Sequence, residues 1–482
     1  MKMKWGLGAG LAGVVALVLL GGPWLAGRQL EARLNAWSAQ AFADSENLYV
    51  ALYRPALNLK VARGWFHSQI EGSFSYVLPI NQRPGIPEDE ARVTLPVAMR
   101  AQHGPVFWSP RPGLGLARIA HAPIALADHL DVSAQDKPLL APLRLEGMTT
   151  LGFGGAIASR WKSAAAEIAL SDAAVSWKGF QARLDWPLDM SRVRAAFAVP
   201  GLEVRSEDKH WIRLDALTGD MDLTAAGPHL WLGDAALSLA SLSARLKDDK
   251  EFSLEGLALS GDARLMGDGA TFASRFRYAL AALRLGEARF SDIILAGSAE
   301  GIDKAAYEDY LGLIAAAAKP SFSGDRAIDS RALMESYGKA FGEVGRRFLA
   351  AGPHLVIDPF GLSTPQGRSE AKLAIGIRYD GPVDEERLPA IARAIDAEAT
   401  VDMTQVHAMA LARIAAERKL RRQGEALAPV EIDAAANALL NELRDKDLIQ
   451  PGNGRYLSQW SLREGVLKVN GQTRADLMRI QP

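Results

Sequence analysis

Apolar and polar residues alternate along most of the chain after residue 48. The pattern is clearest over 395–404, where apolar odd positions alternate with polar even positions without exception. Shorter runs of the same kind occupy 57–61, 93–100, 184–190, 212–215 and 220–223. Because a period of two places successive side chains on opposite faces of a strand, these segments predict half-buried strands with one apolar face.

Turn dipeptides separate these runs. Gly-Asp and Pro-Gly pairs punctuate the region between the predicted strands, and they begin at Pro84, Pro112, Pro200, Gly219, Gly233, Gly261 and Gly267. Such pairs favour tight turns. Since few helical segments intervene before residue 300, antiparallel meanders are favoured over parallel βαβ units.

Helical spacing appears later in the chain. The segments 303–318 and 329–351 carry apolar residues at helical intervals and predict a helical hairpin. A second helical pair is predicted near 405–422 and 430–447. The chain then closes with a predicted β-hairpin from Arg455 to Asn470.

The N-terminus carries a run without charges, from Gly6 to Ala26. At about 1.5 Å per helical residue, a run of this length spans the roughly 30 Å hydrocarbon core of a bilayer. Lys2 and Lys4 precede it and favour a cytoplasmic N-terminus. A cleaved signal peptide is the alternative, but cleavage after Ala26 would place bulky Trp24 where a small residue is preferred. We therefore predict a single-pass membrane anchor with the body outside the cytoplasm.

Glycines within this run form two short motifs. Gly8, Gly10 and Gly13 spell GxGxxG, but no strand–turn–helix context surrounds them, so a dinucleotide site is not predicted. Gly6 and Gly10 form GxxxG, which allows two membrane helices to approach closely. A homodimer through Gly6 and Gly10 is therefore one alternative, and ordinary membrane-helix glycines are the other.

These patterns predict an α+β, β-dominated fold, in which an N-terminal transmembrane helix precedes a large, curved antiparallel β-sheet body with helical insertions. The predicted segments are the cytoplasmic tip and anchor (1–26), an amphipathic stalk helix (27–47), the β-rich body (48–300), a helical hairpin (301–352), a β-rich continuation (353–404), a helical pair (405–448) and a C-terminal β-hairpin (449–482).

Composition narrows the function classes. The 482 residues carry a net charge of −1, so no basic excess points to nucleic acid. The absence of cysteine removes disulfides, thiolate metal sites and cysteine nucleophiles. None of the eight histidines forms an HxH, HxxxH or HExxH spacing, and no nucleophile elbow or phosphate-binding loop is present. The Gly-rich stretch 152–155, with Lys162 downstream, is interpreted as a turn. We predict no cofactor, no metal and no catalytic residues.

Three short motifs recur in one known family. They are Arg63-Gly64-Trp65-Phe66-His67-Ser68, His103-Gly104-Pro105, and the closing stretch around Gly465, Asn470 and Gly471. In order and spacing they resemble the YdgA-like family of bacterial envelope proteins of uncharacterised function, with His67 in place of the usual serine. The resemblance implies a single-pass inner-membrane protein with a periplasmic body, and it implies no activity.

Two functions follow from the strand-to-helix ratio. A long sheet with one apolar face and few helices to cover it favours a non-catalytic protein that offers an apolar surface or groove to a lipid or another hydrophobic ligand. The alternative is a structural scaffold of the cell envelope, which binds protein partners through sheet edges or helices.

Overall fold

A computed structural model describes residues 21–40, 55–79, 90–107, 112–125, 135–245, 251–322, 330–383, 388–423, 428–475 and 477. The chain divides into two compact units. Unit 1 comprises Met1–Lys209, Ala216–Gly233 and Glu308–Phe341, and unit 2 comprises His210–Asp215, Asp234–Tyr307 and Gly342–Pro482. Antiparallel β-sheet dominates both units, as the alternation predicts.

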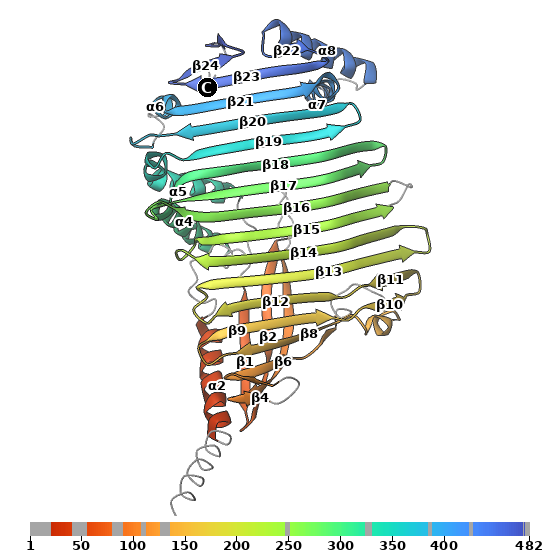
Figure 1. Ribbon diagram of the computed structural model, residues 1–482, viewed down its shortest axis with the longest axis vertical. Coiled ribbons are helices and arrows are strands. Elements are labelled where there is room, and N and C mark those ends of the chain that lie inside the picture. Colours follow the sequence, from red (N-terminus) through yellow and green to blue (C-terminus); the bar gives the residue numbers. More distant parts are fainter. Residues whose placement is uncertain are drawn as a thin grey trace, which may run out of the picture. The chain divides into compact units, whose positions relative to one another are not determined.

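Unit 1 pairs its strands in antiparallel fashion in the order β1–β2–β3–β6–β8–β9–β12–β13–β11–β10 (Figure 1). The elements that lie wholly in this unit are α2 (Gly22–Gln40), β1 (Ala56–Arg63), β2 (His67–Pro79), β3 (Glu90–His103), β4 (Val106–Phe107), β5 (Gly113–Leu114), β6 (Ala117–His121), β7 (Ile124–Ala125), η3 (Lys137–Leu140), β8 (Arg144–Leu151), β9 (Ala156–Ser163), β10 (Ala166–Ala169), β11 (Ala173–Trp177), β12 (Phe180–Pro187) and β13 (Arg192–Ser206).

Unit 2 continues in the order β16–β17–β18–β19–β20–β21–β23–β24–β25. Its elements are β16 (Glu251–Met266), β17 (Thr271–Leu285), β18 (Ala288–Asp303), β19 (His354–Thr364), β20 (Gly367–Ile377), α6 (Leu388–Arg393), β21 (Ile395–Thr404), α7 (Gln405–Gln423), α8 (Pro429–Asp445), β22 (Gln450–Gly452), β23 (Arg455–Arg463), β24 (Val466–Val469) and β25 (Gln472–Thr473). Four elements contribute residues to both units: β14 (Trp211–Ala225), β15 (Trp231–Arg245), α4 (Lys304–Phe322) and α5 (Ser330–Ala350). The helices α4, α5, α7 and α8 all lie where the sequence predicts helices.

The predicted transmembrane helix is wrong. Within the described ranges, no helix is long and apolar enough to cross a membrane. The last residues of the predicted span belong instead to α2, which continues past residue 26 through Arg28 and Glu31. Ala26 and Leu30 are buried in a hydrophobic cluster of unit 1, so this end of the apolar run packs on protein. Residues 6–20, with Gly6 and Gly10, lie outside the described residues, and the inner-membrane location stays a prediction.

A β-bulge in β19 keeps one face of the unit 2 sheet apolar. Ile357 pairs with Leu373 of β20, whereas Phe360 pairs with Ala371. A step of three positions along β19 therefore matches a step of two along β20. Because paired residues lie on the same face, Ile357 and Phe360 both point to the face of Leu373 and Ala371. We call this the apolar face of unit 2.

The kink extends across the neighbouring strands. In β18, the step of three positions from Ser291 to Ile294 opposes a step of two in β19, and Asp292 within this bulge has a φ of +47°. In β16, Gly256 has a φ of +63°. Gly256 and Asp292 mark the kink in their strands. One apolar cross-strand row lies on each side of it, namely Leu257–Leu280–Ile293 and Leu254–Leu283–Phe290. Within each strand, the apolar residues on the two sides of the kink are therefore three positions apart instead of two. The apolar face continues past the kink as a result.

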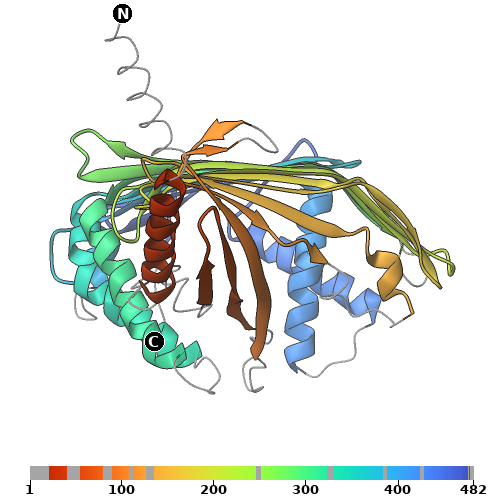
Figure 2. The ribbon, with the colours of Figure 1, turned by 90° about the horizontal axis from the view of Figure 1, so that it is seen from below.

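The opposite face of the unit 2 sheet carries ion pairs, both within a strand and between neighbouring strands. They are Arg264–Asp262, Arg275–Asp262, Lys372–Asp358, Lys372–Glu370, Arg455–Asp402 and Arg463–Glu398. Within unit 2, α7 and the last residues of α5 lie on the same side of the sheet, at opposite ends of its strands (Figure 2).

Candidate functional site

The first family motif forms the turn between β1 and β2 in unit 1. The Gly64 amide donates to the His67 carbonyl at 2.7 Å. A Cβ at Gly64 would lie 2.8 Å from that oxygen, so the close approach requires glycine. The turn leaves Trp65 and Phe66 exposed, while Ser68 at the start of β2 is only 1% exposed.

Ser68 meets the second motif at the end of β3. The Nε2 atom of His103 lies 2.8 Å from the Ser68 hydroxyl, and its Nδ1 atom lies 3.0 Å from the Trp65 carbonyl. Since a carbonyl only accepts, Nδ1 carries the proton, and Nε2 of the neutral ring accepts from Ser68. Both nitrogens of a side chain that is only 3% exposed are thus satisfied.

Helix α2 closes over this pair. A Cβ on Gly27 would lie 2.4 Å from Cε1 of His103, so the helix backbone packs directly on the imidazole. The Arg63 guanidinium, at the end of β1, pairs with Glu31 of α2 at 2.9 Å and lies 5.5 Å from the centre of the Trp24 ring. We call Ser68, His103 and Gly27 the His103 latch, because the three residues join the turn, β3 and α2.

The burial and the hydrogen bonds of the His103 latch favour a structural interpretation. A serine that donates to a histidine has the geometry of a nucleophile and its base. Here, however, both side chains are buried, at 1% exposed for Ser68 and 3% for His103. Burial lowers the pKa of His103, and the Arg63 charge lowers it further, while hydrogen bonds to the backbone of Trp65 and Pro23 act in the opposite direction. The neutral ring therefore serves to position α2 on the sheet.

The other motif residues occupy turns. The Gly104 amide donates to the Leu116 carbonyl at 2.8 Å, and a Cβ there would lie 1.7 Å from the Gly115 oxygen. The peptide bond between Gly104 and Pro105 is cis, and the Pro105 carbonyl accepts from the Gly115 amide at 3.2 Å. The first two motifs thus lie together in one cluster within unit 1.

The closing motif lies in unit 2. Gly465 and Gly471 have φ values of +74° and +83°, which favour glycine. The Asn470 side chain accepts from the Gln459 amide at 2.9 Å and donates to the Asp447 carbonyl at 2.7 Å. These contacts hold the β23–β24 hairpin together, and none of them involves the residues of the His103 latch.

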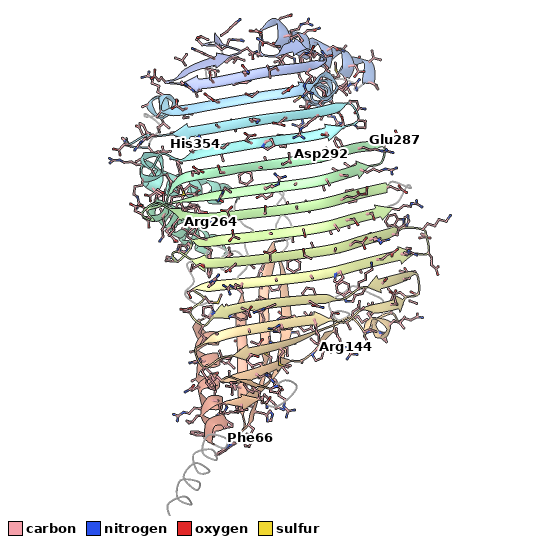
Figure 3. The ribbon with its side chains drawn as sticks, viewed as in Figure 1. Phe66, Arg144, Arg264, Glu287, Asp292 and His354 are labelled. Carbon is pink, nitrogen blue, oxygen red and sulfur yellow. The ribbon has the colours of Figure 1, made fainter. Side chains whose placement is uncertain are left out.

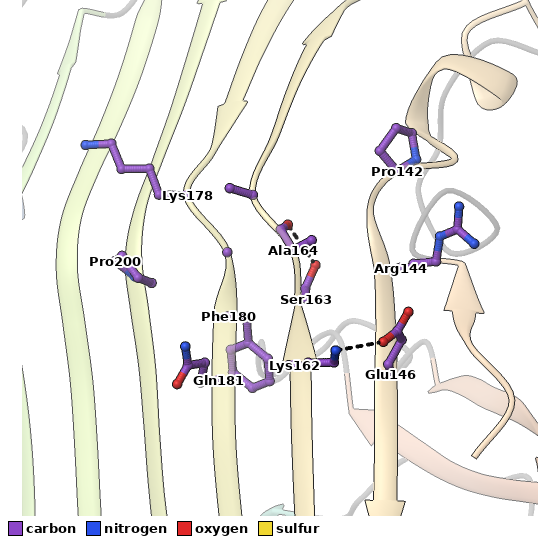
Figure 4. A pocket seen from close by; sticks show the side chains of 12 residues that line it. Pro142, Arg144, Glu146, Lys162, Ser163, Ala164, Lys178, Phe180, Gln181 and Pro200 are labelled. Carbon is purple, nitrogen blue, oxygen red and sulfur yellow. Dashed lines mark hydrogen bonds and ion pairs between the residues drawn. The ribbon is translucent and has the colours of Figure 1, made fainter. Parts of the chain in front are cut away.

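Unit 1 contains a polar hollow of about 560 Å³ between the ends of β8, β9 and β12 (Figure 4). Lys162, which the sequence places near a Gly-rich turn, pairs here with Glu146 at 3.3 Å. Its charge is already partnered, in agreement with the interpretation of residues 152–155 as a turn. In the part of the chain that the structure describes, no group of three His, Asp or Glu side chains could hold a metal ion.

An apolar pocket of about 280 Å³ lies in unit 2 between α7, α8 and the strands β21 and β23. The Ser458 hydroxyl in its lining donates to the Leu448 carbonyl at 2.6 Å. The lining is otherwise almost entirely apolar: Val401, Met403, Ala408, Leu411, Ala412, Ala415, Leu439, Leu440, Leu443, Ile449 and Tyr456.

A row of cross-strand partners connects this pocket with the apolar face of unit 2. The row runs through Tyr278, Leu295, Phe360, Ala371, Val401 and Ser458. Tyr278 and Phe360 remain 45% and 49% exposed. On strands β16 to β19, Phe272 is the one buried large side chain of this face. The face is therefore open to solvent along its middle and leads to a covered, apolar end.

A family model described as "Bacterial protein of unknown function (DUF945)" matches residues 1–474. The chain belongs to this family. No curated protein and no solved structure matches it.

Strict alternation of apolar and polar residues does not identify which residues form the apolar face of unit 2. The signal that could have done so is the three-residue step between apolar positions, as from Ile357 to Phe360, which recurs in neighbouring strands. It was missed because an irregular step is normally interpreted as the end of a strand.

Proposed function

We propose that unit 2 binds the acyl chain of a single-chain lipid on its apolar face, with the end of the chain in the pocket between α7 and α8. The observation that carries the proposal is the half-exposed row from Tyr278 to Val401, which runs into an apolar enclosure. Large exposed apolar surfaces in register are typical of binding sites, and burying them against an acyl chain is favourable by about 25 cal/mol per Å².

The size and chemistry of the pocket favour an acyl chain over a peptide. About 280 Å³ is near the lower end of the roughly 300–1,000 Å³ typical of ligand pockets. A helix about 10 Å across does not fit such a space. An extended peptide would bury backbone groups, and the Ser458 hydroxyl is already engaged. An acyl chain needs no hydrogen bonds and can follow the row of side chains.

Within DUF945, we further propose that the chain is YdgA-like and that it acts in the cell envelope without catalysing a reaction. The support is the set of motifs at Arg63–Ser68, His103–Pro105 and Glu464–Gly471. If the first two motifs act together through α2, relatives that keep the histidine of His103 should also keep a glycine at the position of Gly27. An alignment in which bulky residues replace that glycine while the histidine persists would argue against this grouping.

Displacement of cis-parinaric acid from the purified full-length protein tests the lipid proposal. The fluorescent fatty acid should bind, palmitate should displace it, and mass spectrometry of the purified protein should find co-purified lipid. Ala415→Trp fills the pocket from an exposed position on α7 and should weaken binding at least tenfold.

The matched control is Ala438→Trp, at an exposed position of α8 that does not line the pocket. Its affinity should stay within twofold of the parent protein. Absence of parinarate binding, or equal losses in the two variants, would overturn the proposal. Specific protein crosslinks in membranes without bound lipid would support the scaffold alternative instead.

A further inference from the structure

Five large apolar side chains are exposed at the end of unit 1 where α2 begins. Between 45% and 72% of the surface of each is accessible. They come from α2, the β1–β2 turn, β5 and the β8–β9 turn, and are Leu25, Trp65, Phe66, Leu114 and Phe153. Figure 3 places Phe66 at this end of the unit. We call the five residues the apolar tip of unit 1.

Contacts around Pro105 bring these segments together. A Cβ on Gly22, the first residue of α2, would lie 2.8 Å from Cδ of Pro105. A shallow hollow of about 360 Å³ joins Pro105 to Leu25 and Phe153. The Trp65 ring lies 6.4 Å from that of Trp24 on α2. Phe66 adjoins Trp65 in the β1–β2 turn, and Leu114 adjoins Gly115, whose amide donates to the Pro105 carbonyl, so all five residues belong to segments that meet at this end of the unit.

Two arginines flank the patch. The guanidinium groups of Arg28 and Arg63 lie 6.0 and 5.5 Å from the centre of the Trp24 ring. Glu31 pairs with Arg63, whereas Arg28 forms no ion pair with any residue that the structure describes. The rim is thus net cationic, which suits a surface of anionic phospholipid headgroups.

The composition of the patch points to the same surface. Tryptophan and phenylalanine are favoured at the boundary between headgroups and acyl chains, with arginines beside them at headgroup level. The residues that precede Gly22 in sequence, 6–20, are uncharged, so the chain is apolar on both sides of this point. A protein partner would not require an uncharged segment next to its docking site.

We infer that the apolar tip of unit 1 inserts into the interfacial layer of an anionic bilayer. Side chains of this size reach about 5–10 Å below the headgroups, and Arg28 stays at their level. The interaction is peripheral and uses side chains from four separate segments. It is independent of the acyl-chain site proposed for unit 2.

Flotation of the full-length protein with vesicles tests this inference. Vesicles of mixed phosphatidylglycerol and phosphatidylcholine should carry the protein upward. The triple variant Phe66→Ser, Leu114→Ser, Phe153→Ser should lower the bound fraction at least fivefold. The matched control replaces three exposed apolar residues elsewhere in unit 1, Leu139→Ser, Leu188→Ser and Met221→Ser, and should bind like the parent protein.

The design separates the tip from the rest of the chain. Residues 1–20 are present in every variant, so unchanged flotation of the tip variant would overturn the inference. Equal losses in the tip and control variants would overturn it as well. Arg28→Gln should weaken binding to vesicles with phosphatidylglycerol more than to pure phosphatidylcholine. Circular dichroism and unchanged parinarate affinity of the tip variant show that the fold and the unit 2 site are intact.

Discussion

The His103 latch in unit 1 and the apolar face of unit 2 reverse the usual placement of residue types. In the latch, a serine and a histidine are buried with their hydrogen-bonding groups satisfied. On the face, Tyr278 and Phe360 are left in solvent although they are large and apolar. A buried polar group is kept where it fixes a geometry, and an exposed apolar group where something else is to cover it.

This contrast predicts different responses to substitution. Disruption of the latch leaves polar groups buried without partners or forces backbone apart, so the folded state loses stability. Substitution on the face removes little that the folded protein itself uses. We expect the largest loss of stability from Gly27→Ala in the latch and the smallest from substitutions on the face.

Gly27→Ala should lower the free energy of unfolding by about 2–3 kcal/mol, because its Cβ would lie 2.4 Å from the His103 ring and α2 must shift. Urea titration measures the change. The matched helix variant is Gly338→Ala on α5, where a Cβ meets no atom within 4 Å. It should gain about 0.5–1 kcal/mol from helix propensity. Similar effects at both positions would show that Gly27 is not a contact point.

Ser68→Ala should cost about 1–3 kcal/mol, since Nε2 of the buried His103 loses its donor. The change is measured by the same titration. Ser260→Ala, at an exposed position in β16, serves as the control and should change stability by no more than about 0.5 kcal/mol. A neutral result at Ser68 would mean that water replaces the hydroxyl.

Acid should weaken unit 1 through His103. Burial lowers the pKa of this side chain in the folded state, whereas the unfolded chain titrates near 6.5. The unfolded state therefore binds the extra proton first, and stability falls as the pH drops below about 6.5. His103→Gln should be less stable at neutral pH and show a shallower decline between pH 7 and pH 5. A parallel decline in both proteins would assign the pH dependence to other groups.

Phe360→Ser and Tyr278→Ser should leave stability within about 0.5 kcal/mol of the parent, since both side chains are exposed. Their affinity for cis-parinaric acid should nevertheless fall several-fold. Thermal unfolding and fluorescence titration measure the two quantities on the same samples. A loss of stability above 2 kcal/mol would show that the face is part of the folded core, and it would remove the contrast between the two units.

Much of the secondary structure could be predicted from residue patterns. The strand predicted over 395–404 corresponds to β21, and the four helices predicted after residue 300 are all present. These elements can be predicted from local sequence, because apolar residues recur with a period of two in a half-buried strand and of about 3.6 in an amphipathic helix. The transmembrane prediction failed for a different reason. An uncharged run has the same composition whether lipid or a protein sheet covers it, and Ala26 and Leu30 pack on the sheet.

The candidate sites were less predictable. His103 and Ser68 appeared in separate motifs, and their contact depends on the β2–β3 register, which pairs Ser68 with Ala101 and His67 with Gln102. The apolar face was expected in outline. Its residues could not be named because bulges such as the one between Ile357 and Phe360 change which positions share a face.

The amino-acid sequence by itself determined the antiparallel, β-dominated character of this chain, the positions of its later helices and its lack of cysteine chemistry, because each depends on local pattern or composition. Only the tertiary structure decided that α2 packs on the sheet, that His103 is buried against Gly27, and that one face of unit 2 stays open. These features depend on strand register and on which surfaces remain uncovered, and both arise from contacts between residues far apart in the chain.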